Sequence, residues 1–181
     1  MRIVLVEPQH PGNVGAVARA MANFGITDLA LVNGCKINDD GYARSKSGKP
    51  ILENLKRFDT MEKALADCDI AIGTSGIKPE GDKRWFRAPK DVKKINELIN
   101  ERENPALVFG RENYGLYREE LALCETTITI PTNPDYPILN LSHAVGIVLY
   151  EIKRKEKVKG PKKRKAVSQE EFERLVERIM E

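Results

Sequence analysis

Apolar residues along this chain follow two alternating spacings, one typical of strands and one of amphipathic helices. Short aliphatic or β-branched runs at 3–6, 29–32, 69–73, 106–109 and 128–130 are expected to form strands. Apolar residues at three- and four-residue spacing predict helices over 12–24, 60–66, 89–100 and 140–150, and a short helix ending near Leu121. Because strands alternate with helices, the sequence predicts an α/β fold whose parallel sheet is covered on both faces.

Two segments depart from this alternation. Residues 34–50 have little apolar periodicity, and we expect a loop there that is mobile or faces a partner. Periodicity also ends after Ile152, so the predicted organisation is one domain over 1–152, a basic linker over 153–167 and the start of a C-terminal helical extension over 168–181. A capping box of Ser168 and Glu171 is expected to begin the last helix, whose apolar face needs a partner in the domain, another subunit or elsewhere.

Composition narrows the class of protein. With 181 residues and 41% apolar content, one α/β core is expected. No apolar run approaches the roughly 18 residues of a membrane span, and the apolar stretch near Met1 is too short for a signal peptide, which predicts a cytoplasmic protein. Cys35, Cys68 and Cys124 are widely spaced in apolar surroundings, so we interpret them as core thiols and expect neither disulfides nor zinc.

Charge is distributed unevenly. The net charge is +3, yet residues 153–165 alone carry +8, which leaves −5 for the rest of the chain. Basic clusters next to a folded domain bind nucleic acid phosphates through counterion release, independently of base sequence. A solvated linker without a partner is the alternative interpretation of this tract.

Four polar loops are expected at strand ends. Three contain glycines, PGNVG at 11–15, GTSG at 73–76 and GRENYG at 110–115, and the fourth, 131–139, is stiffened by prolines. Open α/β sheets bind ligands at the carboxyl ends of their strands. The chain lacks GxGxxG, GxxxxGK[ST], GxSxG and HExxH patterns and has only two histidines, which disfavours dinucleotide binding, triad hydrolysis and histidine-based metal chemistry. Positioning and hydrogen bonding remain as the available mechanism.

Three segments resemble a known superfamily. NVGAVARAM at 13–21, FGRENYGL at 109–116 and IPTNPDYPILNLSHAV at 130–145 look like the motifs of the SPOUT RNA methyltransferases. The opening VEPQHPGNVGAVARAMANFG and the NPDYP segment resemble the TrmJ-type tRNA 2′-O-methyltransferases. The resemblance implies an α/β knot with a deep C-terminal trefoil knot, S-adenosylmethionine as cofactor, and tRNA nucleotide 32 in the anticodon loop as the site of ribose methylation. Methylation of the wobble nucleotide or of ribosomal RNA, and a non-catalytic RNA-binding module, are the alternatives.

The resemblance also implies a homodimer through the knot-region helices 12–24 and 140–151, with each site built from both subunits. The apolar stripe of the second helix is then expected to serve the dimer face as well as the core; it comprises Leu141, Ala144, Val145, Val148 and Leu149.

Site residues follow from the same motifs. The resemblance implies a cofactor site made of Thr74, Ser75, Gly76, Gly110, Ile130, Pro137, Ile138 and Leu139. It assigns the main catalytic role to Arg19, and since a guanidinium stays protonated, we expect Arg19 to grip a phosphate or the developing alkoxide. The residues expected to orient it and the substrate are Asn13, Glu112, Asn140 and Ser142. Alternatives are that Glu112 pairs with Arg111 or Arg118 and that Ser142 only caps its helix.

RNA contacts are predicted from cations near aromatic residues. Arg84 and Arg87 flank Trp85 and Phe86, a suitable surface for phosphates and an unstacked base, although the aromatic pair could equally be a hydrophobic plug. From the basic tract we expect Lys162, Lys163 and Arg164 to contribute. No metal is expected.

Overall fold

The computed structural model of the chain describes residues 1–76, 88–154 and 168–180. Its elements, in chain order, are β1 Arg2–Val6, α1 Pro11–Asn23, β2 Asp28–Val32, α2 Asp39–Ser45, η1 Lys46–Gly48, α3 Lys49–Glu53, β3 Lys56–Phe58, α4 Met61–Leu65, β4 Ile70–Ser75, β5 Lys90–Asp91, η2 Val92–Lys94, α5 Ile95–Leu98, β6 Pro105–Phe109, α6 Arg118–Ala122, β7 Thr126–Thr129, α7 Leu141–Lys153 and α8 Gln169–Met180.

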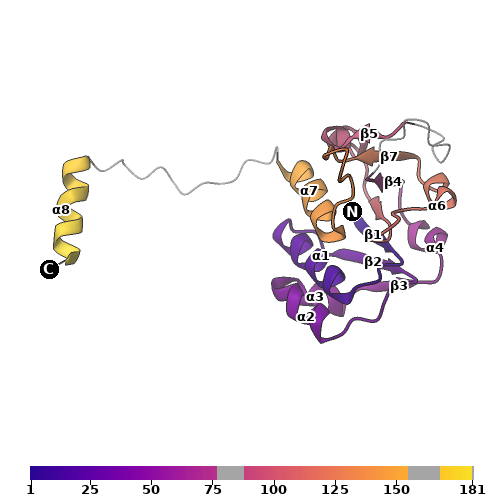
Figure 1. The fold of residues 1–181 in the computed structure, drawn as a ribbon, viewed down its shortest axis with the longest axis horizontal. Coiled ribbons are helices and arrows are strands. Elements are labelled where there is room, and N and C mark those ends of the chain that lie inside the picture. The colour runs from indigo at the N-terminus through magenta and orange to yellow at the C-terminus, as the bar shows by residue number, and fades with distance from the viewer. Residues whose placement is uncertain (77–87, 155–167, 181) are drawn as a thin grey trace.

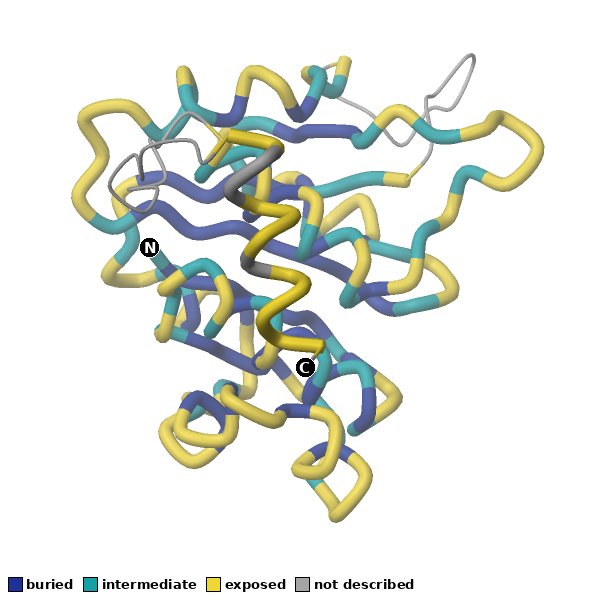
Figure 2. The backbone as a smooth tube through the Cα atoms, turned by 90° about the vertical axis from the view of Figure 1, so that its left-hand side faces the viewer, coloured by how far each residue is buried: buried dark blue, intermediate teal, exposed yellow. Residues whose placement is uncertain are grey.

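One seven-stranded sheet organises the domain, in the order β3-β2-β1-β6-β4-β7-β5, and its pairings are parallel. Helices cover both faces (Figure 1). Along β1, Ile3 and Leu5 pack with α1, α3, α5 and α7, whereas Val4 and Val6 point to the opposite face and pack with α4 and α6. This alternation is the two-residue period of a strand, and it divides the core into two layers. Figure 2 shows the buried strands running between the exposed outer segments.

The main elements agree with the sequence pattern. The five predicted strands correspond to β1, β2, β4, β6 and β7, and the predicted α/β class with a parallel sheet is confirmed. Thr60 is the N-cap of α4, its hydroxyl accepting a hydrogen bond from the Lys63 amide. The helix predicted over 89–100 is wrong in extent, because this segment contains β5, η2 and an α5 helix of only four residues.

The loop expected over 34–50 is also wrong. This segment forms α2, η1 and the start of α3, and it packs on α1 through glycines. A Cβ placed on Gly15 would lie 2.0 Å from the carbonyl oxygen of Gly41, and one on Gly48 would lie 2.4 Å from that of Ala18. Because backbone meets backbone at these points, the contact leaves no apolar periodicity in the sequence.

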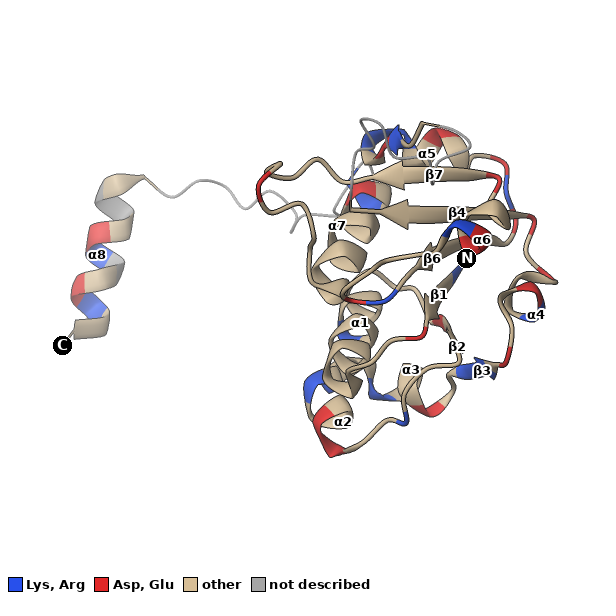
Figure 3. Ribbon diagram, turned by 45° about the vertical axis from the view of Figure 1, so that its right-hand side comes forward, with Lys and Arg blue, Asp and Glu red and all other residues tan. Residues whose placement is uncertain are grey.

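The apolar stripe of α7 belongs to this chain's own core. Leu141, Val145, Val148 and Leu149 are buried there, so the expectation that they also form the dimer face is wrong for these side chains. Another face of α7 is open: Ile147 and Tyr150 are exposed, and nothing lies within 4 Å of a Cβ placed on Gly146. Figure 3 shows α7 beside α1, on which it packs.

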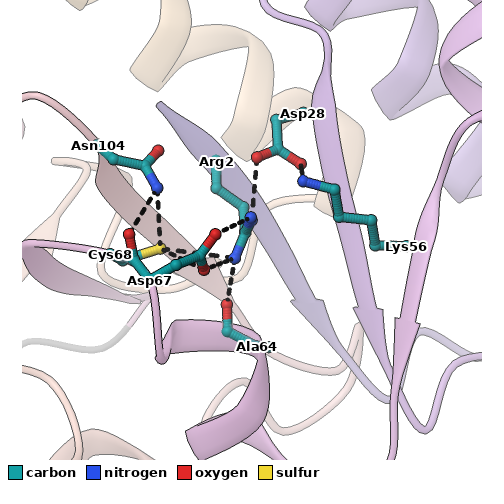
Figure 4. A network of polar contacts seen from close by, with 7 residues as sticks. All are labelled: Arg2, Asp28, Lys56, Ala64, Asp67, Cys68 and Asn104. Carbon is teal, nitrogen blue, oxygen red and sulfur yellow. Dashed lines mark hydrogen bonds and ion pairs between the residues drawn. The ribbon is translucent and has the colours of Figure 1, made fainter.

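At the amino edge of the sheet, a buried arginine joins three elements. Arg2 at the start of β1 pairs with Asp28 of β2 at 3.0 Å, contacts Asp67 after α4 through two nitrogens, and donates to the Ala64 carbonyl at 2.8 Å (Figure 4). Burying an unpaired guanidinium would cost free energy, and the ion pairs with Asp67 and Asp28 offset that cost. The network fixes β1 against β2 and α4.

The remaining sequence expectations concern the cysteines and the tail. Cys35, Cys68 and Cys124 are free thiols, partly rather than fully buried, and burial raises the pKa of Cys124 to about 12. Most of the predicted linker and the side chain of Glu171 lie outside the described residues. The tail helix is confirmed as α8, with exposed Phe172, Val176, Ile179 and Met180. The division into domain, linker and extension stays a prediction, as does the knot.

The glycine contact between α1 and α2 predicts the effect of one methyl group. Gly15→Ala should destabilise the fold by about 2 kcal/mol or more, because the steric cost against Gly41 exceeds the roughly 1 kcal/mol that alanine gains in a helix. Urea unfolding measures it, with Ala16→Gly, at a half-buried position of the same helix, as a control for helix propensity. An equal or higher midpoint for Gly15→Ala would contradict the described packing.

Candidate active site

A cavity of about 190 Å³ opens at the carboxyl edge of the sheet, where β4, β6 and β7 end. Parallel strands bring the loops that follow them to one edge, so segments distant in sequence meet there. The walls are largely apolar, with Phe109, Leu116, Leu121, Ile128, Leu141 and Ala144 behind the loops.

All eight residues expected to hold a cofactor line this cavity: Thr74, Ser75, Gly76, Gly110, Ile130, Pro137, Ile138 and Leu139. Gly110 must be glycine, because a Cβ there would lie 2.0 Å from the carbonyl carbon of Gly115. Thr74 donates its hydroxyl to the Val108 carbonyl at 3.0 Å, which anchors the end of β4 on β6. The lining therefore presents backbone groups and apolar side chains from fixed loops.

The loop between β7 and α7 closes on itself. Thr132 donates its hydroxyl to the Pro137 carbonyl at 3.1 Å, and the Tyr136 amide donates to the Asn133 carbonyl at 3.0 Å. The Asn133 side chain also accepts from the Asp135 amide at 3.0 Å. These bonds and the fixed φ angles of the prolines hold Pro137 to Leu139 against the cavity.

Four of the five predicted catalytic residues form one chain of hydrogen bonds beside the cavity. Asn13 of α1 donates to Glu112 at 2.9 Å, and Asn140 donates to the Asn13 side-chain oxygen at 3.0 Å. Asn140 is the N-cap of α7 and accepts from both the amide and the hydroxyl of Ser142, at 2.9 and 2.8 Å. Ser142 thus contributes to capping as well as to this polar chain.

Glu112 is an acceptor at neutral pH. Its carboxylate takes hydrogen bonds from Asn13 and from the backbone amides of Gln9 and His10, at 3.0 and 3.2 Å for the amides. Burial alone would raise the pKa of Glu112, but these hydrogen bonds outweigh it and hold the pKa below the usual range. An ionised Glu112 orients donors and is poorly suited to donate a proton.

The fifth predicted catalytic residue is not in this cavity. Arg19 is exposed on α1 and is not among the residues that line it. The predicted RNA contacts Arg84, Arg87, Lys162, Lys163 and Arg164 lie outside the described residues.

The most highly connected residue that the sequence-based prediction of the site missed is Arg111. Arg111 lines the cavity and pairs with Glu7 and Glu120, so the alternative that Arg111 pairs with Glu112 is wrong. The pair with Glu7 joins positions 104 residues apart along the chain, and nothing in the sequence indicates it. The pair with Glu120 joins positions nine residues apart, and only the spacing of Tyr117 and Glu120, which form a helix cap, hinted at it.

Within the described ranges, no group of three or more His, Cys, Asp or Glu side chains is placed to hold a metal ion. No helix in that part of the chain is both long and apolar enough to cross a membrane.

Residues 1–150 match the SpoU rRNA Methylase family. The chain belongs to this family. Among SpoU methylase relatives, the tRNA (cytidine-2′-O-)-methyltransferase TrmJ of Methanocaldococcus jannaschii is 42% identical over 156 residues, covering 85% of this chain and 67% of the relative. The chain spans about two thirds of the length of the curated relatives it matches.

Solved structures agree with this assignment. TrmJ from Z. mobilis ZM4 superposes with a TM-score of 0.77 at 32% identity, covering 99% of this chain and 77% of that one. The SpoU methyltransferase AviRb from Streptomyces viridochromogenes, solved with the cofactor AdoMet, shares the fold at a TM-score of 0.66 and 22% identity, over 85% of this chain and 59% of that one. The resemblance to SPOUT methyltransferases stated from the three motifs is confirmed.

The depressed pKa of Glu112 makes a prediction for this SpoU methylase. A carboxylate whose folded pKa is lowered adds stability above its unfolded pKa, about 4.3, and loses that contribution as pH falls through the folded value. The stability difference between wild type and Glu112→Gln should therefore be largest at neutral pH and shrink below about pH 4. Urea unfolding from pH 3 to 7 tests it, with exposed Glu53→Gln as the control. A pH-independent difference would show that Glu112 is not held as described.

Proposed function

We propose that this chain uses S-adenosylmethionine to methylate the ribose 2′-hydroxyl of nucleotide 32 in the anticodon loop of tRNA. The observation that carries the proposal is the junction of a largely apolar cavity with the chain of hydrogen bonds from Glu112 to Ser142. The SpoU family and the tRNA cytidine 2′-O-methyltransferase named among its relatives support the reaction type. Position 32 follows from the sequence resemblance, and a cytoplasmic location stays a prediction.

The cavity fits the cofactor chemically. Adenine and a methionine side chain need apolar walls with backbone donors and acceptors, which Ile130, Ile138 and Leu139 provide together with the glycines. A Cβ on Gly76 would lie 3.3 Å from the Pro137 carbonyl, so glycine lets the two loops approach closely. Once bound, S-adenosylmethionine supplies an electrophilic methyl group on a sulfonium.

The polar chain supplies orientation. Methyl transfer needs the attacking oxygen in line with the methyl carbon, so alignment contributes much of the rate. Glu112 fixes the Asn13 amide, and Asn13 in turn fixes Asn140 at the start of α7. We assign to Asn13, Asn140 and Ser142 the placement of the ribose and the end of the cofactor, with Arg19 gripping a phosphate or the developing alkoxide.

We infer that Arg19 serves the site of the other subunit in a homodimer. It is exposed and outside the cavity of its own chain, which fits the expectation that each site draws residues from both subunits. The open face of α7, with His143, Gly146, Ile147 and Tyr150 at helical spacing, is the surface we propose for the partner. RNA contact by Arg84, Arg87, Lys162, Lys163 and Arg164 remains part of the proposal.

Mapping of methylated nucleotides tests the reaction. Unmodified tRNA transcripts incubated with the enzyme and S-adenosylmethionine should gain one ribose methyl at nucleotide 32, detected by mass spectrometry of nuclease fragments. Ribose methylation at the wobble nucleotide, or only in ribosomal RNA, would show that one of these alternatives is the substrate. A methylated base with unchanged riboses would refute the 2′-O assignment, and failure to bind S-adenosylmethionine would favour a non-catalytic module.

Complementation tests the placement of Arg19. Arg19→Ala and Glu112→Gln should each be nearly inactive as homodimers. Co-expressed with different tags and purified as the mixed dimer, they should recover about half of wild-type activity, because one of two sites then has both residues intact. A mixed dimer no more active than its parents would place Arg19 in its own chain's site; co-purified Arg19→Ala chains with two tags are the control.

A further inference from the structure

The Arg111 guanidinium is buried and fully engaged by protein groups. Its side chain is 5% exposed. Nε donates to Glu7 at 2.8 Å, and the two terminal nitrogens donate to the two oxygens of Glu120 at 3.0 and 2.9 Å. The Tyr117 ring covers the guanidinium at 4.0 Å. This is the bidentate geometry that arginine, and not lysine, provides.

These contacts join three elements around the cavity. Glu7 follows β1, Arg111 follows β6, and Glu120 lies in α6, where it also accepts from the Tyr117 amide at 2.7 Å. Glu7 has a φ of 45°, a conformation that side-chain-bearing residues rarely adopt. Such backbone persists only where its surroundings determine it, and the ion pair with Arg111 is one such determinant.

The loop that carries Arg111 is closed by its own backbone. Arg111 and Gly115 exchange amide-to-carbonyl hydrogen bonds at 3.1 and 2.9 Å, and Gly115 has a φ of 66°. Because the loop bonds internally, its attachment to the neighbouring loop after β1 comes from the side chains of Arg111 and Glu112. Arg111 grips Glu7, and Glu112 takes the amides of Gln9 and His10 just beyond it.

We propose that Arg111 is the positioning residue that holds loop 110–115 so that the Glu112 carboxylate meets Asn13. The inference rests on the proposed function for its catalytic consequence. Arg111 acts through Glu112. Without the bidentate contacts of Arg111, loop 110–115 shifts relative to the loop after β1, and Glu112 no longer accepts hydrogen bonds from both the Gln9 amide and the Asn13 side chain. The cavity walls built from β4 and from Pro137 to Leu139 do not depend on it.

A comparison within the molecule separates positioning from simple stabilisation. Arg2 is equally buried and is paired with Asp28 and Asp67 (Figure 4). It lies at the amino edge of the sheet and does not line the cavity. Replacing either arginine by lysine keeps the charge and removes the fork. Both changes should lower the melting temperature, and only the change at Arg111 should alter catalysis by the folded protein.

The kinetic test uses the whole chain of each variant below its melting temperature. Arg111→Lys should lower kcat for methyl transfer roughly tenfold or more and raise the Kd for S-adenosylmethionine by a clearly smaller factor, because only one of the loops that line the cavity carries Arg111. Arg2→Lys should leave kcat within about twofold. In a double-mutant cycle, Arg111→Lys added to Glu112→Gln should cause little further loss, because both changes act at the same carboxylate. An unchanged kcat for Arg111→Lys, or independent multiplicative losses, would overturn the proposal.

Titration of the Glu112 carboxyl group tests the positioning role of Arg111 without any measurement of methyl transfer. Carbon-13 NMR of the Glu112 side-chain carboxyl should show a lowered pKa in wild type, returning toward the ordinary value in Arg111→Lys but not in Arg2→Lys. Cys35 also faces this carboxylate, and its burial raises the pKa of its thiol, so it stays neutral across the titration. An enzyme that methylates no RNA would refute the proposed function, whereas an unchanged Glu112 titration in Arg111→Lys would refute the positioning role.

Discussion

The hydrogen bonds to the Glu112 carboxylate are the interaction on which the rest of the site depends. They join the loop after β1, the first turn of α1 and the loop after β6, and through Asn13 they reach the start of α7. A partly buried carboxylate is costly without partners, and here three donors compensate it. The parallel sheet makes this possible, because it gathers the loops of distant segments at one edge.

Buried arginines at the two edges of the sheet stabilise different parts of the structure. At the amino edge, Arg2 ties β1 to β2 and α4 and contributes to stability. At the carboxyl edge, Arg111 and Glu112 fix a loop whose backbone bonds mainly to itself. The cavity at this carboxyl edge has largely apolar walls, which suit a cofactor that carries its own reactive group. In the proposed reaction, the protein contributes position and hydrogen bonds.

Much of this could be predicted from the sequence, for identifiable reasons. Strands such as 3–6 and helices such as 12–24 bury side chains on regular faces, which leaves periodicity, and the loops of the proposed cofactor site carry recognisable motifs. The helices over 39–53 were missed because this segment packs on α1 through backbone, at Gly15 and at Gly48. Strand β3 was missed because it is a short edge strand that exposes Lys56 and Arg57. The partners of Arg111 were missed because they are a tertiary pairing, and the stripe of α7 could not reveal which of its neighbours would cover it.

A crystal structure of the chain with S-adenosylhomocysteine is the decisive test of the proposed site. We predict that the adenosine lies among Thr74, Gly76, Gly110 and Pro137 to Leu139, and that the homocysteine sulfur faces the Asn13 and Glu112 pair, with loop 110–115 unchanged. Binding elsewhere on the molecule, or binding that separates Glu112 from Asn13, would contradict it.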